Sequence, residues 1–190
     1  MSLTTHRYIL SVDADEVISE ELRKTLIDLK TSDRIREHRM YAIEMVSYIG
    51  GEPVRHTVYG PHPEVRLFDK RYATWDMRDI GERVCFSDSI RPEKLHGCIL
   101  HYRSHSLREF EEKELRHASI RARSLAAGRK KIHPFEPFAK SLAEYINCMV
   151  GQGAIFDGKV GRHIARVRSK AAASAYRGAR RIHKKKHSGA

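Results

Sequence analysis

The sequence has few cysteines and no long apolar run, and each of these features excludes a class of protein. Its three cysteines, Cys85, Cys98 and Cys148, are scattered and odd in number, so we expect neither a disulfide scaffold nor a cysteine zinc site. No stretch approaches the roughly 18 to 20 apolar residues that a membrane-spanning helix needs. Residues 1–12 lack a basic segment followed by a long apolar run, so we expect no signal peptide there.

Apolar and charged residues are both plentiful. Apolar residues make up 41% of the 190 positions and charged residues 32%, which is enough apolar material for a folded core. The formal net charge is +12, and the segment 158–190 holds eleven Lys or Arg residues and no Asp or Glu. A basic segment of this kind is typical of contact with nucleic acid or with an anionic membrane surface. Nucleic acid is the less favoured partner, because the sequence carries no recognised nucleic-acid-binding motif.

The first half is predicted to begin with a strand, an acidic loop and a helix. Residues 8–12 form a short apolar run that is typical of a buried strand. Ser19 then predicts a helix N-cap, and apolar residues at helical spacing follow from Leu22 to Leu29. Further strands are predicted over three ranges: 40–49, 64–69 and 98–102.

The second half is predicted to be helical. Ser106 and Glu109 form a capping-box pair at the start of one helix, and Gly128 ends that helix. A second helix is predicted from about residue 138 to 150 and a third from about 159. The predicted organisation has three parts: a sheet-containing part at 1–105, a helical region at 106–182 and a basic disordered tail at 183–190.

Asp13 and Asp15 follow the first predicted strand. Two carboxylates at this spacing can face one hard cation such as Mg²⁺ or Mn²⁺, and a metal held in this way neutralises a diphosphate. The carboxyl end of a strand is also where α/β proteins bind ligands. The alternative is a polar loop that leads into the helix, with Glu16 as a residue favoured near the helix start.

Several short motifs follow one another along the chain. The first is the run I-L-S-V-D-A-D-E, and the others lie at 51–56 (G-E-P-V-R-H), 65–68 (V-R-L-F), 80–84 (I-G-E-R-V), 99–102 (I-L-H-Y), 106–107, 113 and 156–161 (F-D-G-K-V-G). This ordered set, from about Tyr8 to Lys184, resembles family 2 glycosyltransferases, and more specifically the bacterial lipopolysaccharide core glucosyltransferase-like branch. Two departures stand out: the nucleotide-binding βα units that precede the D-x-D strand in the family are not in this sequence, and Gly81 stands where the family often has histidine.

The resemblance implies a partial glycosyltransferase A (Rossmann-like) α/β fold with a mixed sheet, followed by a C-terminal helical extension. It implies a metal-dependent, inverting transfer of a sugar from a UDP-sugar to a cell-envelope glycan such as the lipopolysaccharide core. Asp13 and Asp15 would hold Mg²⁺ or Mn²⁺ against the diphosphate. Glu82 would be the base that deprotonates the acceptor hydroxyl, and the alternative for Glu82 is a surface ion pair with Arg83 or Arg78.

Three further residues are candidates for substrate binding. Arg66 lies in a predicted strand, where it could contact a phosphate bidentately or face solvent. His101 is interpreted as a partly buried histidine near the cleft, because its predicted strand argues against a helical metal pair with His105. Trp75, together with Tyr72, could stack on a sugar ring or take part in ordinary core packing.

The predicted C-terminal helix has a narrow apolar stripe surrounded by basic residues. The stripe consists of Val160, Ile164, Val167, Ala171 and Ala175. Such a helix can lie on an anionic bilayer or dock on the body of its own protein, and both alternatives stay open. The resemblance implies a cytoplasmic protein that is peripheral on the inner face of the bacterial plasma membrane, with a lipid-linked glycan as acceptor.

Two other hypotheses compete with a transferase. The first is a basic nucleic-acid-binding protein, which the C-terminal charge motivates. The second is a non-catalytic remnant or partner subunit, which the missing nucleotide-binding portion and Gly81 motivate. A remnant with an open sheet edge should be poorly soluble or oligomeric, because an unpaired edge strand recruits other strands.

Overall fold

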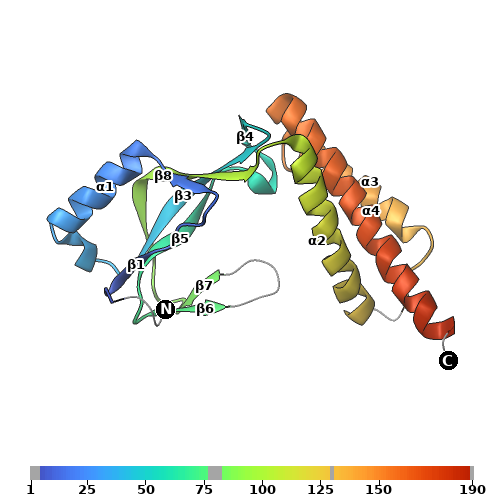
Figure 1. Ribbon diagram of the computed structural model, residues 1–190, viewed down its shortest axis with the longest axis horizontal. Helices are drawn as coiled ribbons and strands as arrows, with labels where there is room; N and C mark the ends of the chain where they lie inside the picture. Colours follow the sequence, from blue (N-terminus) through green and yellow to red (C-terminus); the bar gives the residue numbers. More distant parts are fainter. Residues whose placement is uncertain (1–4, 77–82, 129–130, 189–190) are drawn as a thin grey trace. The chain divides into compact units, whose positions relative to one another are not determined.

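The computed structural model describes residues 5–76, 83–128 and 131–188. The chain is a mixed α/β protein with a C-terminal helical region, as predicted, and Figure 1 shows its elements. It divides into two compact units: unit 1 is Met1–Ser47 with Pro61–Tyr102, and unit 2 is Tyr48–Gly60 with Arg103–Ala190. The predicted boundary after residue 105 lies near one of these divisions, but the sequence did not indicate that residues 48–60 belong with the helices.

A mixed sheet has the strand order β1–β5–β3–β8–β2, with β4 beside β3. Its strands are β1 (Tyr8–Leu10), β2 (Glu16–Ile18), β3 (Met40–Ile49), β4 (Glu52–Pro53), β5 (His62–Asp69) and β8 (Glu93–Ser104). The pairs β1/β5, β3/β5 and β2/β8 are antiparallel. Gly50 N donates to Ser104 O where β3 and β8 both end, so these two strands run in the same direction. The strands predicted at 40–49, 64–69 and 98–102 are β3, most of β5 and part of β8.

Two apolar clusters hold unit 1 together. Alternating residues of β3 point to opposite faces of the sheet. On one face, Ile43 packs with Leu22 of α1 (Glu20–Thr31). On the other face, Met40 packs with Phe68 and with a separate hairpin formed by β6 (Ala73–Asp76) and β7 (Arg83–Phe86).

The start of α1 agrees with the prediction. Ser19 is its N-cap, and Ser19 Oγ accepts hydrogen bonds from the backbone N–H groups of Leu22 and Cys98, both at 3.2 Å. Gly97 in β8 makes this close approach possible, because it has a φ of +95° and a Cβ there would lie 2.3 Å from Leu22 N. Only glycine fits such a position without strain.

The first strand departs from its prediction. β1 covers Tyr8–Leu10 and lies at the edge of the sheet, where Leu10 is exposed. The apolar run indicated a buried strand, but strand order depends on long-range pairing that an apolar run does not specify. The loop that carries Asp13 and Asp15 therefore follows an antiparallel edge strand and not a buried central one.

Unit 2 is built on three long helices. They are α2 (Leu107–Gly128), α3 (Glu136–Ile146) and α4 (Gly158–Ser188), with a wide helical turn, η3 (Asn147–Gly151), directly after α3 and a 3₁₀ turn, η4 (Ala154–Asp157), before α4. α4 packs against both α2 and α3 (Figure 1). The predicted cap of α2 is present, because Ser106 Oγ accepts from Glu109 N at 3.1 Å. The helix is described as far as Gly128, and residues 129–130 lie outside the described part of the chain.

The apolar stripe of α4 is buried in unit 2. Ala171 and Ala175 pack against Ala118 of α2, and Val160, Ile164 and Val167 lie in the core near Phe110. Small residues let the two helices approach closely, and a Cβ at Gly178 would lie 2.8 Å from Ala122 Cβ. Docking on the protein's own body is therefore confirmed, and insertion of this stripe into a bilayer is ruled out.

The C-terminal tail also differs from its prediction. We expected a basic disordered segment at 183–190, but α4 continues to Ser188. The helix reaches this point because the segment contains no Pro, and its Gly residue at 189 comes only after the helix has ended.

Candidate functional site

A β-bulge in β5 places Arg66 at the centre of a charged cluster in unit 1. Tyr41 of β3 pairs with Leu67 of β5. The next residue of β3, Ala42, pairs with Val65, so Arg66 is the extra residue at this point of the ladder. Bulges re-aim a side chain and are common beside active sites. Arg66 is only 8% exposed, so the alternative in which it faces solvent is wrong.

Glu16, at the start of β2, is the main partner of Arg66. Arg66 Nη2 lies 2.6 Å from Glu16 Oε1, and the side chain of Glu16 is fully buried. The backbone N–H of Asp13 donates to the other oxygen, Glu16 Oε2, at 2.9 Å. Burial raises the pKa of the Glu16 carboxyl above its ordinary value, against the opposing effects of the Asp13 N–H and the Arg66 guanidinium. This buried ion pair joins the start of β2 to β5.

The loop between β1 and β2 brings the two predicted metal ligands to different basic partners. Asp13 Oδ2 lies 3.6 Å from Arg66 Nη1, and Asp15 Oδ2 lies 3.3 Å from His101 Nε2. The two aspartate side chains are 58% and 48% exposed. Ser11 N donates to Arg66 O at 2.8 Å, which fixes the start of the loop on β5. Both carboxylates are thus held near the sheet and remain accessible from solvent.

β8 contributes His101 to the same cluster. His101 Nδ1 lies 3.6 Å from Glu16 Oε1, and the ring is largely buried. The neighbouring Tyr102 N donates to Asp15 O at 2.9 Å, so the end of the loop is fixed beside β8. The structure therefore gathers four of the predicted site residues, from the loop, β5 and β8: Asp13, Asp15, Arg66 and His101.

Carboxylates outnumber cations in this cluster. Glu64 of β5 adds a further one, with its Oε2 3.5 Å from Arg66 Nη2. The four carboxylates are those of Asp13, Asp15, Glu16 and Glu64, and the basic groups are those of Arg66 and His101. A partly exposed site with an excess of negative charge attracts cations. Arg66 also keeps a buried Nε–H that has no hydrogen-bond partner among the described residues.

Asp13 and Asp15 fit part of a metal ligand set. Within 5–76, 83–128 and 131–188, no group of three or more His, Cys, Asp or Glu side chains has the arrangement of a complete metal site. Mg²⁺ in nucleotide sites takes one or two protein carboxylates and fills its other positions with phosphate oxygens and water. The two exposed aspartates match that smaller protein contribution, and a diphosphate would have to supply further oxygens.

Two predicted site residues are not part of this cluster as described. Glu82, the predicted base, lies outside the described residues. Trp75, a predicted sugar-stacking residue, lies in β6 opposite Val84 of β7. The cluster therefore contains the predicted metal ligands, Asp13 and Asp15, and the predicted phosphate contact, Arg66.

Sequence reasoning missed the roles of Glu16 and Glu64. Glu16 was interpreted as a polar residue near a helix start, and its partner Arg66 is 50 positions away in sequence, so no local pattern joins them. Glu64 had a usable signal: it stands two residues before Arg66 in a predicted strand, and residues at that spacing share a face.

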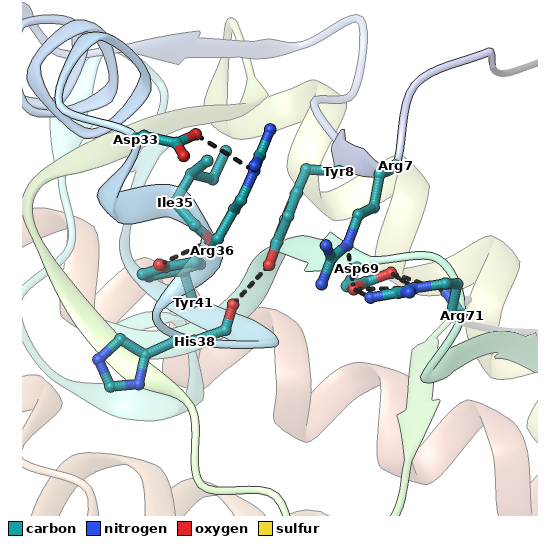
Figure 2. Close-up of polar contacts among 9 residues, drawn as sticks. All are labelled: Arg7, Tyr8, Asp33, Ile35, Arg36, His38, Tyr41, Asp69 and Arg71. Carbon is teal, nitrogen blue, oxygen red and sulfur yellow. Dashed lines mark hydrogen bonds and ion pairs between the residues drawn. The ribbon is translucent and has the colours of Figure 1, made fainter.

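A second polar cluster joins β1 to β5 at the N-terminal end of β1, whereas the first cluster lies beyond its C-terminal end. The buried carboxylate of Asp69 accepts from Arg7 Nε at 2.7 Å and from Arg71 Nη2 at 2.8 Å, and Figure 2 shows the two arginines converging on it. Burial opposes ionisation, but the hydrogen bonds from Arg71 and Arg7 outweigh it and lower the pKa of Asp69 to about 2. Tyr8 Oη donates to His38 O at 2.9 Å beside it. A pocket of about 500 Å³ lies against Tyr8 and Arg36. We therefore assign this cluster a structural role, which is to hold β1 against β5.

Two of the family-like motifs meet within unit 2. Asp157, from F-D-G-K-V-G, accepts from the backbone N–H groups of Arg55 and His56 at 3.1 and 2.9 Å, and its Oδ1 lies 3.0 Å from His56 Nδ1. The Asp157 side chain is buried. Nearby, Tyr59 Oη donates to Glu114 Oε1 at 3.0 Å, and burial raises the pKa of Tyr59 well above its ordinary value. These bonds fix residues 55–59 against the helices.

Comparison with known proteins gives no family assignment. The sequence matches no protein-family model, and the structure matches no solved protein structure. Within the described part of the chain, no helix combines the length and the apolar character that crossing a membrane requires.

Proposed function

We propose that the chain is the acceptor-side part of a metal-dependent, inverting glycosyltransferase with a partial glycosyltransferase A fold. It would transfer a sugar from a UDP-sugar to a cell-envelope glycan such as the lipopolysaccharide core. One observation carries the proposal: residues selected from three separate sequence segments lie together in unit 1. They are Asp13, Asp15, Arg66 and His101.

The cluster offers complementary groups for a metal-bound diphosphate. Asp13 and Asp15 would hold Mg²⁺ or Mn²⁺, and the bound metal would neutralise the charge of the leaving diphosphate. Arg66 would contribute the positive charge of its guanidinium to the binding of a phosphate, while its Nη2 stays paired with Glu16. His101, held between Asp15 and Glu16, would orient the loop that carries both aspartates.

Glu82 is proposed as the base of the transfer step. The acceptor hydroxyl oxygen would attack the anomeric carbon of the sugar and form the new glycosidic bond. The bond between that carbon and the diphosphate oxygen would break, so UDP leaves with the electron pair. The hydroxyl proton would pass to the Glu82 carboxylate.

Binding of Mn²⁺ and UDP-glucose provides the test. The groups proposed for the metal and the diphosphate are in this chain, so we expect isothermal titration with UDP-glucose to show binding that requires Mn²⁺ and is carried by the diphosphate. Asp15→Ala should weaken this binding by about tenfold or more, because it removes one of two protein ligands of the metal. Asp28→Ala is the matched control, since Asp28 is an exposed aspartate of α1 outside the cluster, and it should bind like the unmodified chain.

Two results would count against the proposal. The first is the absence of any Mn²⁺-dependent binding of UDP-glucose. The second is equal binding by Asp15→Ala and Asp28→Ala, which would place the ligand somewhere other than the cluster.

A second candidate function is a non-catalytic binding module or partner subunit. The edge position of β1 favours it, because β1 pairs only with β5 among the described residues, and an open edge can accept a strand from another chain. This candidate predicts concentration-dependent oligomers in analytical ultracentrifugation and no binding of UDP-glucose. A monomer that binds UDP-glucose with Mn²⁺ would argue against it.

A further inference from the structure

The helix α3, the residue before it and the turns after it expose a series of large apolar side chains, here called the α3 apolar face. Its members are Phe135, Phe138, Leu142, Ile146, Val150, Ile155 and Phe156. They are seven of the fifteen large hydrophobic residues that are exposed in the described part of the chain. Phe138 and Phe156 are 71% and 78% exposed. Single exposed apolar residues are ordinary, but a concentration of this size marks an interaction surface.

The helix α3 turns most of its large apolar side chains to solvent. Apolar residues recur every fourth position from Phe138 to Val150, so they share one side of the helix. The other side packs on α4 through polar contacts and through Tyr145, which lies against the apolar cluster of Ile164 and Val167. Ser141 and Ser169 share a hydroxyl hydrogen bond of 2.8 Å, and Arg168 Nε donates to a carboxylate of α3 at 2.7 Å. The core therefore does not use the α3 apolar face, although surface helices normally turn this face inward.

Exposed cations lie close in sequence to the α3 apolar face. They are Lys131, Lys140, Lys159 and Arg162. The acidic residues of the segment are engaged elsewhere: Glu144 with Arg168, Asp157 with the buried bonds to His56, and Glu136 with the backbone N–H of His133. Unit 2 as a whole holds 22 Lys and Arg against 8 Asp and Glu, a net charge of +14.

We propose that the α3 apolar face inserts into the interface of an anionic lipid bilayer, with the positive charge of unit 2 attracting the headgroups. Phe and Leu beside Lys and Arg is the composition of helices that lie in a membrane interface, and anionic lipids attract each basic residue near the surface. A second copy of the chain is disfavoured, because it would bring two units of charge +14 face to face. This inference goes beyond the proposed transferase activity and does not depend on it.

Vesicle binding by the whole chain tests the inference. We expect co-sedimentation with vesicles of roughly three parts phosphatidylcholine to one part phosphatidylglycerol, and weaker binding to phosphatidylcholine alone. Phe138→Ser/Phe156→Ser should lower the partition coefficient about tenfold or more, because it removes two exposed rings that would enter the bilayer. The matched control is Leu115→Ser/Ile120→Ser, which removes two exposed apolar side chains of α2 in the same unit and should bind as the unmodified chain does. Unchanged helical circular dichroism would show that both variants fold.

Three outcomes would overturn the inference. The first is no binding to the mixed vesicles, and the second is equal binding by the Phe138→Ser/Phe156→Ser variant. The third is a dimer in lipid-free sedimentation equilibrium that this variant dissociates, which would assign the face to a second copy. Titration of the same preparations with Mn²⁺ and UDP-glucose reports on the cluster in unit 1, so failure of either proposal can be told from failure of the other.

Discussion

Unit 1 and unit 2 reach stable folds with opposite distributions of charge and apolar surface. Unit 1 holds 14 Lys and Arg against 16 Asp and Glu, a net charge of −2, and buries ion pairs around Arg66 and Asp69. Unit 2 has a net charge of +14 and packs α2 on α4 through alanine. It leaves the α3 apolar face exposed.

The difference indicates where ligands of each kind would bind. A cluster of partly exposed carboxylates with a buried arginine suits a cation and the anionic group that the cation carries. A cationic helical surface with an exposed apolar face suits an anionic bilayer. The chain has one tryptophan, Trp75, and it lies in unit 1, so its fluorescence reports unfolding of unit 1, while helical circular dichroism reports mainly on unit 2.

Gly97→Ala should have the largest effect, and it should act on unit 1. A Cβ at this position would lie 2.3 Å from Leu22 N, and the backbone φ is +95°, so steric overlap and strain together should cost about 4 kcal/mol. Urea unfolding followed by Trp75 fluorescence measures the loss. Gly51→Ala is the control for backbone strain alone, because Gly51 has a φ of +83° but no neighbour within 4 Å of an added Cβ. Gly51 belongs to unit 2, so its expected cost of about 1 kcal/mol is measured by helical circular dichroism. Equal losses in the two variants would show that the contact with α1 does not limit stability.

Arg66→Met should destabilise unit 1 by about 3 kcal/mol, because it leaves the buried carboxylate of Glu16 without its partner. The double variant Arg66→Met/Glu16→Gln should recover much of this loss, since the uncompensated charge is gone. Arg36→Met, at an exposed ion pair with Asp33, is the control and should change stability by less than about 0.5 kcal/mol. If the double variant is no more stable than Arg66→Met, the unpaired Glu16 carboxylate is not the cause of the lost stability.

Asp69 should make the stability of unit 1 sensitive to acid. Its pKa of about 2 in the folded chain lies below the ordinary value of about 3.9. The ionised carboxylate therefore contributes about 2 kcal/mol above about pH 4, and this contribution is lost as the pH falls toward 2. Asp69→Asn should lower stability by that amount at pH 7, and the difference from the unmodified chain should shrink toward pH 2. Asp28→Asn, at an exposed position, should show no such pH dependence, and a parallel dependence in both variants would refute the assignment.

Tyr59→Phe should have the smallest effect, and it should act on unit 2. It removes the hydrogen bond from Tyr59 Oη to Glu114 and should cost about 1 kcal/mol. Helical circular dichroism during urea unfolding measures the change. Tyr72→Phe is the control because the Tyr72 ring is partly exposed in unit 1. A shift of the Trp75 transition equal to the helical transition in Tyr59→Phe would show that the two units unfold together.

Local signals in the sequence predicted several elements well. The strand at 40–49 was predicted with its observed bounds, because a mostly apolar segment in a central strand is a strong signal. The cap at Ser19 was predicted because capping is a local hydrogen bond. The cap of α2 at Ser106 follows the same logic.

Features that depend on contacts between distant parts of the chain could not be predicted from the sequence. The bulge at Arg66 arises from the register between β3 and β5, which no local pattern specifies. The edge position of β1 likewise depends on strand order. The apolar residues from Phe138 onward indicated a helix but not which side of it would face solvent, because that depends on how α4 packs.

The most direct test of the proposed metal–diphosphate site is paramagnetic broadening of the His101 ring signals by Mn²⁺ in the presence of UDP-glucose. His101 Nε2 lies 3.3 Å from Asp15 Oδ2, so a metal held by Asp13 and Asp15 should broaden the His101 signals at substoichiometric Mn²⁺. His101→Gln assigns the resonance. We predict broadening of His101 that Asp15→Ala abolishes. Broadening that persists in Asp15→Ala, or His101 signals that Mn²⁺ and UDP-glucose leave sharp, would contradict the proposed site.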